Sequence, residues 1–296
     1  MNKSGLASMG ILLSAFFWGT SGILTQIGLV ETTPMQLIAI RFIVAAMVAG
    51  VFLKPNLKSL SSKSMITGLV LSALLTVMYV TSTIGLKYTS ASNAGFIIGA
   101  AVVFVPIINQ LLFKAKGKPK EYVAAVICLI GLGLVTLAGS TPLNYGDLLC
   151  FGDTIAYALF IIYSSRISES EDLNLLGFIQ YVLVALFSGT YSLLVEGPVL
   201  SIGLESMLVL LTLGVFCTFV AFQVQLRAQQ HISAEKAGRL LTFIPIFTVL
   251  VDFLVFKTQL SPAAMLGGAL IIMATVLGDL DFKHVFASLS GTVAEG

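Results

Sequence analysis

Ten runs of apolar residues, each about as long as a membrane is thick, constrain this chain more than any other feature of its sequence. A helix that rises ~1.5 Å per residue needs roughly 20 apolar residues to cross the hydrocarbon core of a bilayer. The runs cover residues 6–29, 34–53, 64–87, 90–113, 120–139, 146–165, 173–195, 204–229, 232–256 and 262–280. We therefore predict an all-α membrane protein with ten transmembrane helices.

The composition excludes a soluble protein of this size. Hydrophobic residues make up 57% and charged residues 10% of the 296 positions, and the mean hydropathy is +1.01. A soluble domain is nearer to roughly 25% charged, so membrane lipid must solvate much of this surface. The net charge of +2 gives no reason to expect a nucleic-acid partner.

Candidate metal ligands and catalytic groups are scarce. His231 and His284 lie far apart, and the three cysteines fall inside or beside apolar runs, where we expect small buried hydrophobes. The sequence contains no nucleophile elbow, zinc-protease motif or phosphate-binding loop. We predict neither an enzyme nor a bound metal or cofactor, and the missing phosphate-binding loop disfavours an ATP-driven pump.

Lysine and arginine are distributed unevenly between the two sides of the predicted bundle. If the N-terminus lies inside, thirteen of them fall on the cytoplasmic side, and Lys87 and Lys257 fall outside. Basic residues are enriched in cytoplasmic loops. We therefore predict cytoplasmic N- and C-termini in a multi-pass protein of the cell inner membrane.

The two halves of the chain resemble each other weakly. Residues 87–134 align without gaps with residues 230–277, with ten identities in 48 positions, and Pro119 meets Pro262. Five helices per half, an odd number, give the second half the opposite orientation, as in the inverted repeats of secondary transporters. The alternative is a duplication without a transport role. We predict a first repeat over 1–140, a second, inverted repeat over 141–283, and a flexible tail over 284–296.

Polar and aromatic side chains form stripes on six predicted helices, whereas the runs 120–139 and 262–280 are almost wholly apolar and read as peripheral packing helices. Polar groups within a membrane tend to face the bundle or a cavity. Hydrogen bonds between helices would explain isolated Ser and Thr, but aromatic rings within the stripes favour a lined cavity. The predicted substrate-binding residues are Trp18, Ser21, Thr76, Tyr79, Thr83, Asn93, Phe96, Asp153, Tyr157, Gln223, Arg239 and Phe243.

Two charges fall well inside predicted helices. Arg41 and Asp153 each lie ~10 Å from the outer end of their helix. A lone buried charge is costly, so we expect the two to be electrostatically coupled to each other or to a substrate charge. A structural ion pair and a substrate or proton site both remain open.

Several local patterns occur in a telling order: the segment 17–21 (FWGTS), Arg41, the run 88–96 (YTSASNAGF), Pro106, and the stretch from Ser233 to Pro245. Together they resemble the EamA-type branch of the drug/metabolite transporter superfamily, across essentially the whole chain. The resemblance implies ten helices, a central cavity lined by the first, third, fourth, sixth, eighth and ninth, and export of small metabolites such as amino acids. In plan the chain looks most like an aromatic amino acid exporter of this family.

The chain also departs from the pattern of many relatives. A glutamine replaces a lysine late in the first helix, and the acidic positions near the fourth and ninth helices are occupied by other residues (Gln26, Lys116, Ile244, Thr258). The substrate and the coupling ion therefore cannot be carried over from the family.

We expect a secondary transporter that exports amino acids or similar small metabolites by alternating access. Asp153, with the rings of Trp18 and Tyr157, would equally suit efflux of drugs or organic cations, and a non-transporting membrane receptor or scaffold is the alternative from another class. Proton coupling stays open, as does the choice between a monomer and a weak homodimer.

Overall fold

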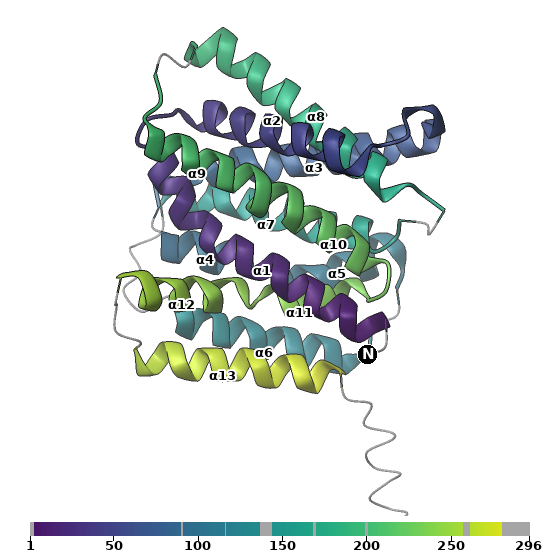
Figure 1. The fold of residues 1–296 in the computed structure, drawn as a ribbon. Coiled ribbons are helices and arrows are strands. Elements are labelled where there is room, and N and C mark those ends of the chain that lie inside the picture. Colours follow the sequence, from purple (N-terminus) through teal and green to yellow (C-terminus); the bar gives the residue numbers. More distant parts are fainter. Residues whose placement is uncertain are drawn as a thin grey trace, which may run out of the picture.

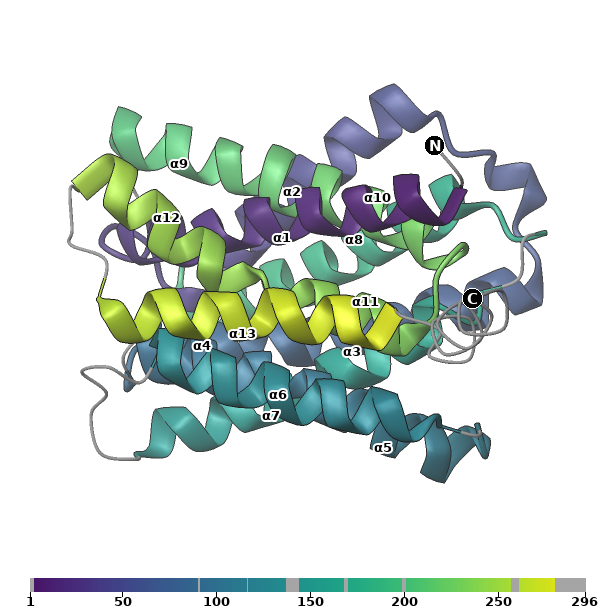
Figure 2. The same cartoon turned by 90° about the horizontal axis from the view of Figure 1, so that it is seen from below.

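The computed structural model of the chain describes residues 3–89, 91–115, 117–136, 144–167, 170–198, 201–256 and 261–279. The regular structure in these ranges is entirely helical. The helices run along one common direction, with the start of α1 and the end of α13 at the same end of the bundle (Figures 1 and 2). We call this end the terminal end and the opposite one the distal end.

The chain order divides naturally between the two predicted halves. The first half contains α1 (Lys3–Gly28), α2 (Pro34–Leu53), the short η1 (Leu57–Ser59), α3 (Ser62–Gly85), α4 (Ala91–Gly99), α5 (Ala101–Phe113) and α6 (Pro119–Thr136). The second half contains α7 (Tyr145–Ser164), α8 (Leu173–Tyr191), η2 (Ser192–Glu196), α9 (Leu204–Gly214), η3 (Val215–Val220), α10 (Ala221–Gln229), α11 (Ala234–Leu241), α12 (Ile244–Phe256) and α13 (Pro262–Asp279).

Eight stretches of the described ranges are long and apolar enough to cross a membrane, and three of them join consecutive helices: α4 with α5, α8 with η2, and α9 through α10. α13 is apolar but slightly shorter, and the path from α11 to α12 is interrupted. Large apolar side chains such as Met47, Phe52 and Leu194 are exposed on the bundle, where lipid is the expected neighbour.

The fourth helix predicted in each half is broken, and the two breaks occupy aligned positions. In the alignment of 87–134 with 230–277, the starts of α4, α5 and α6 coincide with the starts of α11, α12 and α13. Pro245 explains the second break, because its ring excludes the carbonyl of Leu241, where α11 ends. The first break follows Gly99, a residue that weakens helices. The predicted spans over 90–113 and 232–256 each contain a local break that apolar periodicity does not reveal.

A π-helical turn, η3, interrupts the helix formed by α9 and α10. Thr218 Oγ1 donates to the carbonyl of Leu213 across this turn at 2.9 Å. The wider turn changes the regular hydrogen-bonding pattern, which leaves carbonyl groups available to side chains of other helices. The Cys217 carbonyl of this turn accepts hydrogen bonds from Trp18 and Arg41, two residues predicted for the site.

The outermost helices pair with their repeat counterparts. α6 lies along α13 at one edge of the bundle, and α2 lies along α8 towards the opposite edge (Figure 1). A Cβ built on Gly131 would lie 2.7 Å from the carbonyl oxygen of Gly267, so the two backbones of α6 and α13 are in direct contact. Small residues permit such close approach of membrane helices. These two helices, predicted to pack at the periphery, pack closely against each other at the edge of the bundle.

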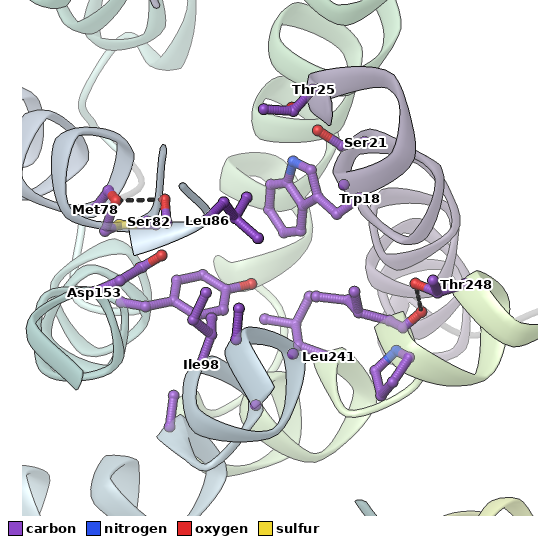
Figure 3. A pocket seen from close by; sticks show the side chains of 18 of the residues that line it. Trp18, Ser21, Thr25, Met78, Ser82, Leu86, Ile98, Asp153, Leu241 and Thr248 are labelled. Atoms are coloured by element: carbon purple, nitrogen blue, oxygen red, sulfur yellow. Dashed lines mark hydrogen bonds between the residues drawn. The ribbon is translucent and has the colours of Figure 1, made fainter. Parts of the chain in front are cut away.

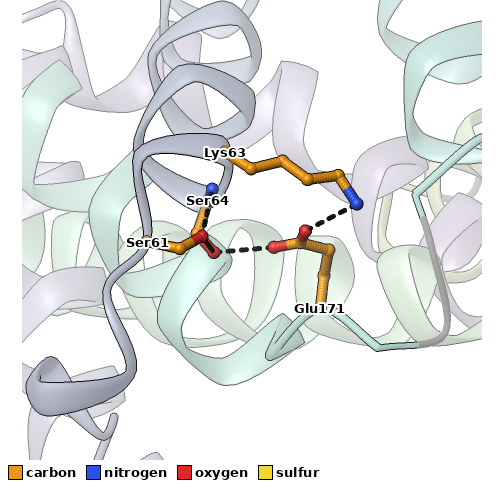
Figure 4. Close-up of polar contacts among 4 residues, drawn as sticks. All are labelled: Ser61, Lys63, Ser64 and Glu171. Atoms are coloured by element: carbon orange, nitrogen blue, oxygen red, sulfur yellow. Dashed lines mark hydrogen bonds and ion pairs between the residues drawn. The ribbon is translucent and has the colours of Figure 1, made fainter.

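Polar clusters fasten the connecting segments. At the terminal end, Ser61 caps α3 and the Ser64 hydroxyl donates to Glu171 at 2.7 Å, while Lys63 forms an ion pair with Glu171 at 3.0 Å (Figure 4). Thr33 and Gln36 form a capping box at the start of α2. The predicted burial of the three cysteines, Cys128, Cys150 and Cys217, is confirmed, and all three are free.

Candidate functional site

A cavity of about 560 Å³ occupies the middle and the distal half of the bundle. Its walls come mainly from α1, α3, α4, α7, α11 and α12. On α1 the lining begins at Trp18 and ends at Gln26, and on α3 it reaches Leu86, at the distal ends of these helices. The volume is typical of sites for small organic molecules. Figure 3 shows the side chains of α1 facing those of α3 and α7 across this space.

Seven of the residues predicted for the site line this cavity: Trp18, Ser21, Arg41, Tyr79, Thr83, Asp153 and Tyr157. They come from four helices, α1, α2, α3 and α7, so the fold brings together positions far apart in sequence. Both halves of the chain therefore contribute to one space. The tip of α6 also reaches it through Val135 and Thr136, so the predicted exclusion of this helix from the cavity is wrong.

Five other predicted residues, two from the first half and three from the second, lie outside the lining. Thr76 donates to the carbonyl of Ser72 in its own helix at 2.8 Å. Phe96 does not line the cavity, whereas Ala94, Gly95 and Ile98 of the same helix do. A stripe spans a wide arc of a helix, and the cavity takes only part of it. Asn93 belongs to α4, but its side chain lies outside the described part of the structure.

The remaining three belong to the second half and pack against other helices. Gln223 is buried against Gly177 of α8, and the guanidinium of Arg239 is buried against Gly278 of α13. Phe243 sits in the break between α11 and α12, with its ring 6.4 Å from that of Phe247. The break turns α11 relative to α12, so a stripe drawn on one continuous helix points in the wrong direction.

Several lining residues are not among those predicted from the sequence pattern, including Ser82, Ile98, Leu241 and Thr248 (Figure 3). Ser82 follows Tyr79 by three positions and so shares its helical face, a signal that was present in the pattern. Ile98 and Leu241 are ordinary apolar residues next to the two helix breaks. Their place in the wall depends on those breaks, which apolar periodicity does not reveal.

Aromatic rings form the deeper wall of the cavity. Trp18 lies with its ring centroid 4.8 Å from that of Phe222 and 6.0 Å from that of Tyr157, in an edge-on arrangement with the tyrosine. Tyr79 lies 6.2 Å from Phe222 on the other side. These four rings come from α1, α3, α7 and α10. They offer apolar and edge-on contacts to a ligand.

Arg41 is held against the π-helical turn. Its Nε donates to Thr218 Oγ1 at 2.5 Å and its Nη2 to the Cys217 carbonyl at 3.0 Å, which also accepts from Trp18 Nε1 at 2.9 Å. The guanidinium also stacks 4.7 Å from the centre of the Tyr79 ring. The turn therefore positions a cation and the largest ring of the site through one carbonyl.

Arg41 and Asp153 form no ion pair with each other in the described residues, so the structural pair, one of the two roles left open by the sequence, is not seen. Arg41 is turned towards η3, and Asp153 lies on α7 beside Ser82, whose hydroxyl donates to the Met78 carbonyl at 2.6 Å (Figure 3). Asp153 Oδ1 and the Tyr157 hydroxyl are buried without a hydrogen-bond partner among the described residues. Both charges nevertheless line the same cavity.

The terminal end of the bundle is closed by polar contacts between the two halves. Asn109 of α5 donates to Glu235 of α11 at 2.6 Å, and Arg166, after α7, donates to Asn109 at 2.8 Å. Within the second half, Gln229 of α10 donates to the carbonyl of Ile161 at 3.1 Å. Ile161 is also where the cavity lining ends on α7, so these contacts separate the cavity from the terminal end.

The chain is similar to known membrane transporters in sequence and to a solved structure in fold. A transporter of Archaeoglobus fulgidus without an assigned substrate is 27% identical over 93% of this chain and 86% of its own length. The inner membrane transporter YedA of Escherichia coli, also uncharacterized, is 24% identical over 95% of this chain and 93% of its own. A solved crystal structure with 17% identity superimposes with a TM-score of 0.80, covering 94% of this chain and 98% of the other, which supports the fold.

The family match follows the repeat. The EamA-like transporter family matches the chain twice, over residues 5–137 and again over residues 144–277. Each match covers one half of the helical order described above. The family resemblance seen in the sequence is thus confirmed, and a transporter rather than an enzyme is the function of its members. The chain is a membrane-spanning transporter and belongs to the EamA-like transporter family.

Proposed function

We infer that this transporter is a secondary transporter that exports amino acids or similar small metabolites across the cell inner membrane by alternating access. The observation that carries the inference is the cavity, which both halves line and which reaches the distal end while cross-half contacts close the terminal end. A scaffold has no need of such a space. The paired helix breaks beside it match the discontinuous helices that line transporter sites.

The proposed membrane arrangement has ten spans. The broken pairs α4–α5 and α11–α12 count as one span each, and α13 as the last. The halves 1–140 and 141–283 then form inverted repeats. Lysine-rich connections at the terminal end, including Lys54, Lys58 and Lys118, support a cytoplasmic position for that end. The relative YedA, named as an inner membrane transporter, supports the same membrane.

A second candidate function, efflux of organic cations, is favoured by one observation. Asp153 is a buried carboxyl in the cavity wall without an ion pair in the described structure, with the rings of Trp18 and Tyr157 nearby. Cations bind carboxylates and the faces of such rings.

Uptake into proteoliposomes tests the proposal. The purified protein should exchange radiolabelled members of an amino acid and metabolite panel, and Trp18→Ala, Tyr79→Ala and Tyr157→Ala should each lower the uptake rate roughly tenfold, because each removes a ring from the cavity wall. Thermal unfolding in detergent checks that the variants fold. Unchanged uptake in all three would remove these residues from the site, and uptake of none of the panel would overturn the function.

A further inference from the structure

The cavity contains two opposite charges that do not neutralise each other. Arg41 lies on α2 and Asp153 on α7, so the two charges come from different halves of the chain. A buried charge without a partner is costly in a membrane protein. Each charge must therefore be solvated, be paired with a mobile partner or, in the case of Asp153, be neutralised by a proton.

Arg41 is fixed in position but not saturated. Nε and Nη2 donate to the η3 turn, whereas Nη1 has no hydrogen-bond partner among the described residues. The side chain is also a wall of the cavity. A guanidinium presents its donors in a rigid fork that suits carboxylates. The hydrogen bonds to η3 orient this fork before any ligand arrives.

Asp153 is the acceptor on the other side. The residue is 5% exposed, and its Oδ1 lacks a partner in the described structure. Ser82 lies beside the carboxyl and its hydroxyl donates to the Met78 carbonyl at 2.6 Å, while Asp153 Oδ1 stays without a donor. The carboxyl thus retains capacity for a donor group that enters the cavity, and an ammonium group has three.

The two charges lie beside neighbouring turns of α3. Arg41 stacks on Tyr79 and Asp153 lies beside Ser82, three residues further on, a rise of ~4.5 Å. The aromatic wall of Trp18, Tyr157 and Phe222 lies next to both. The cavity therefore offers an anion site, a cation site and an apolar surface within the span of one small molecule.

We propose that Arg41 and Asp153 are the two ends of a clamp for a zwitterion, with the substrate's carboxylate at Arg41, its ammonium group at Asp153 and its apolar body against the rings. This rests on the proposed function and decides between its two candidates, because an organic cation would use Asp153 alone. Neither charge has an ion-pair partner within the described protein, and a zwitterion neutralises both at once.

The first test needs no variant. Binding to the purified full chain is measured for leucine, methionine and phenylalanine, for their amides, which lack the carboxylate, and for their N-acetyl derivatives, which lack the ammonium group. At least one parent amino acid should bind roughly tenfold or more tightly than both of its derivatives, because each derivative leaves one buried charge unpaired. Amides that bind as well as the parents would overturn the clamp in favour of cation efflux, and parents that fail to bind would overturn it altogether.

The second test assigns each end. Asp153→Asn should weaken binding of the parent amino acid and remove its advantage over the N-acetyl derivative, while Arg41→Gln should remove the advantage over the amide. Lys87→Gln and Glu205→Gln, which remove exposed charges outside the cavity, serve as matched controls and should change neither ratio. Equal ratios in the wild type and in folded Arg41 and Asp153 variants would overturn the clamp.

The two proposals fail differently. Proteoliposomes that transport a neutral or singly charged solute, with unchanged rates in both variants, would refute the clamp and leave the transporter proposal intact. Proteoliposomes that move no solute of the metabolite or cation panels would refute the proposed function, whatever the binding results.

Discussion

At the residue scale, the side chains of Arg41, Asp153 and Trp18 meet in one cavity although they belong to three different helices. Arg41, Asp153 and Trp18 stand out in apolar runs, and all three line the cavity. Arg41 does not pair with Asp153, because its hydrogen-bond acceptors are Thr218 and the Cys217 carbonyl, which are far away in sequence. A carbonyl freed by a π-helical turn has no signature in side-chain chemistry.

The Glu171 cluster at the terminal end gives a pH-dependent prediction. The Ser64 hydroxyl and then the Lys63 ammonium hold the pKa of Glu171 below its usual value. A carboxyl with a lowered folded-state pKa stabilises the protein fully above its ordinary pKa of about 4, and this contribution is lost as the pH falls through the lowered value. Glu171→Gln should therefore lower the Tm by a few degrees at pH 7, as for a loss of about 1 kcal/mol.

The difference in Tm between Glu171→Gln and the wild type should shrink as the pH is taken below about 4. Differential scanning fluorimetry in detergent measures it. Glu205→Gln, at an exposed position on α9, is the control and should show little difference at either pH. A difference in Tm between Glu171→Gln and the wild type that stays constant down to acid pH would show that the ionised carboxylate does not contribute to stability.

At the element scale, periodicity located the membrane helices well, since apolar length is set by the bilayer. It failed at the helix breaks of α4–α5 and α11–α12 and therefore misplaced Phe243 and Arg239. A helix break depends on single residues such as Pro245 and on whether neighbouring helices can satisfy the backbone groups that the break frees. The repeat alignment, in contrast, carried information on register that one helix alone does not contain.

Close contact of α6 with α13 predicts opposite effects at two adjacent glycines. A methyl group at Gly267 would overlap the carbonyl of Gly131, whereas one at Gly268 would meet Ile246 at 3.9 Å. Gly267→Ala should therefore destabilise the protein by roughly 1–3 kcal/mol, because the two backbones must separate. Gly268→Ala should be neutral or gain up to about 1 kcal/mol from helix propensity.

Thermal unfolding of the two alanine variants in the same detergent measures this difference directly. The two residues are neighbours on one helix, so any general effect of alanine on α13 is shared. Equal midpoints for both variants would mean that α6 and α13 are not in backbone contact in the membrane protein.

At the scale of the whole molecule, the closed terminal end is the part of the bundle that the proposed alternating access would have to open. The sequence suggested two states through the inverted repeat, but it gave no sign of which contacts hold one state. Asn109, Arg166 and Glu235 come from three separate helices or their ends. Their hydrogen bonds join the halves, so they stabilise the described state and are lost when the halves separate at this end.

Asn109→Ala should therefore shift the population towards a form open at the terminal end. The variant loses the hydrogen bonds of Asn109 to the charged groups of Glu235 and Arg166, which favours the open form. A cysteine introduced at Ile161, the last lining position on α7, should therefore react with a membrane-impermeant thiol reagent added on that side roughly tenfold faster than the same cysteine with Asn109 intact. Gln110→Ala is the matched control, because its partner Tyr122 lies within the same half. Equal labelling rates in both variants would exclude this cluster as a gate.

The contact between α6 and α13 has a symmetry of its own. In the repeat alignment Gly131 corresponds to Ala274 and Gly267 to Ala124, and all four are buried. The meeting of Gly131 with Gly267 thus maps onto a meeting of Ala274 with Ala124 when the halves are exchanged, which is the property of an interface between two identical subunits. A half-length protein using this seam would need equal numbers of copies inserted in each direction. Joining the halves in one polypeptide supplies one copy of each orientation at every synthesis.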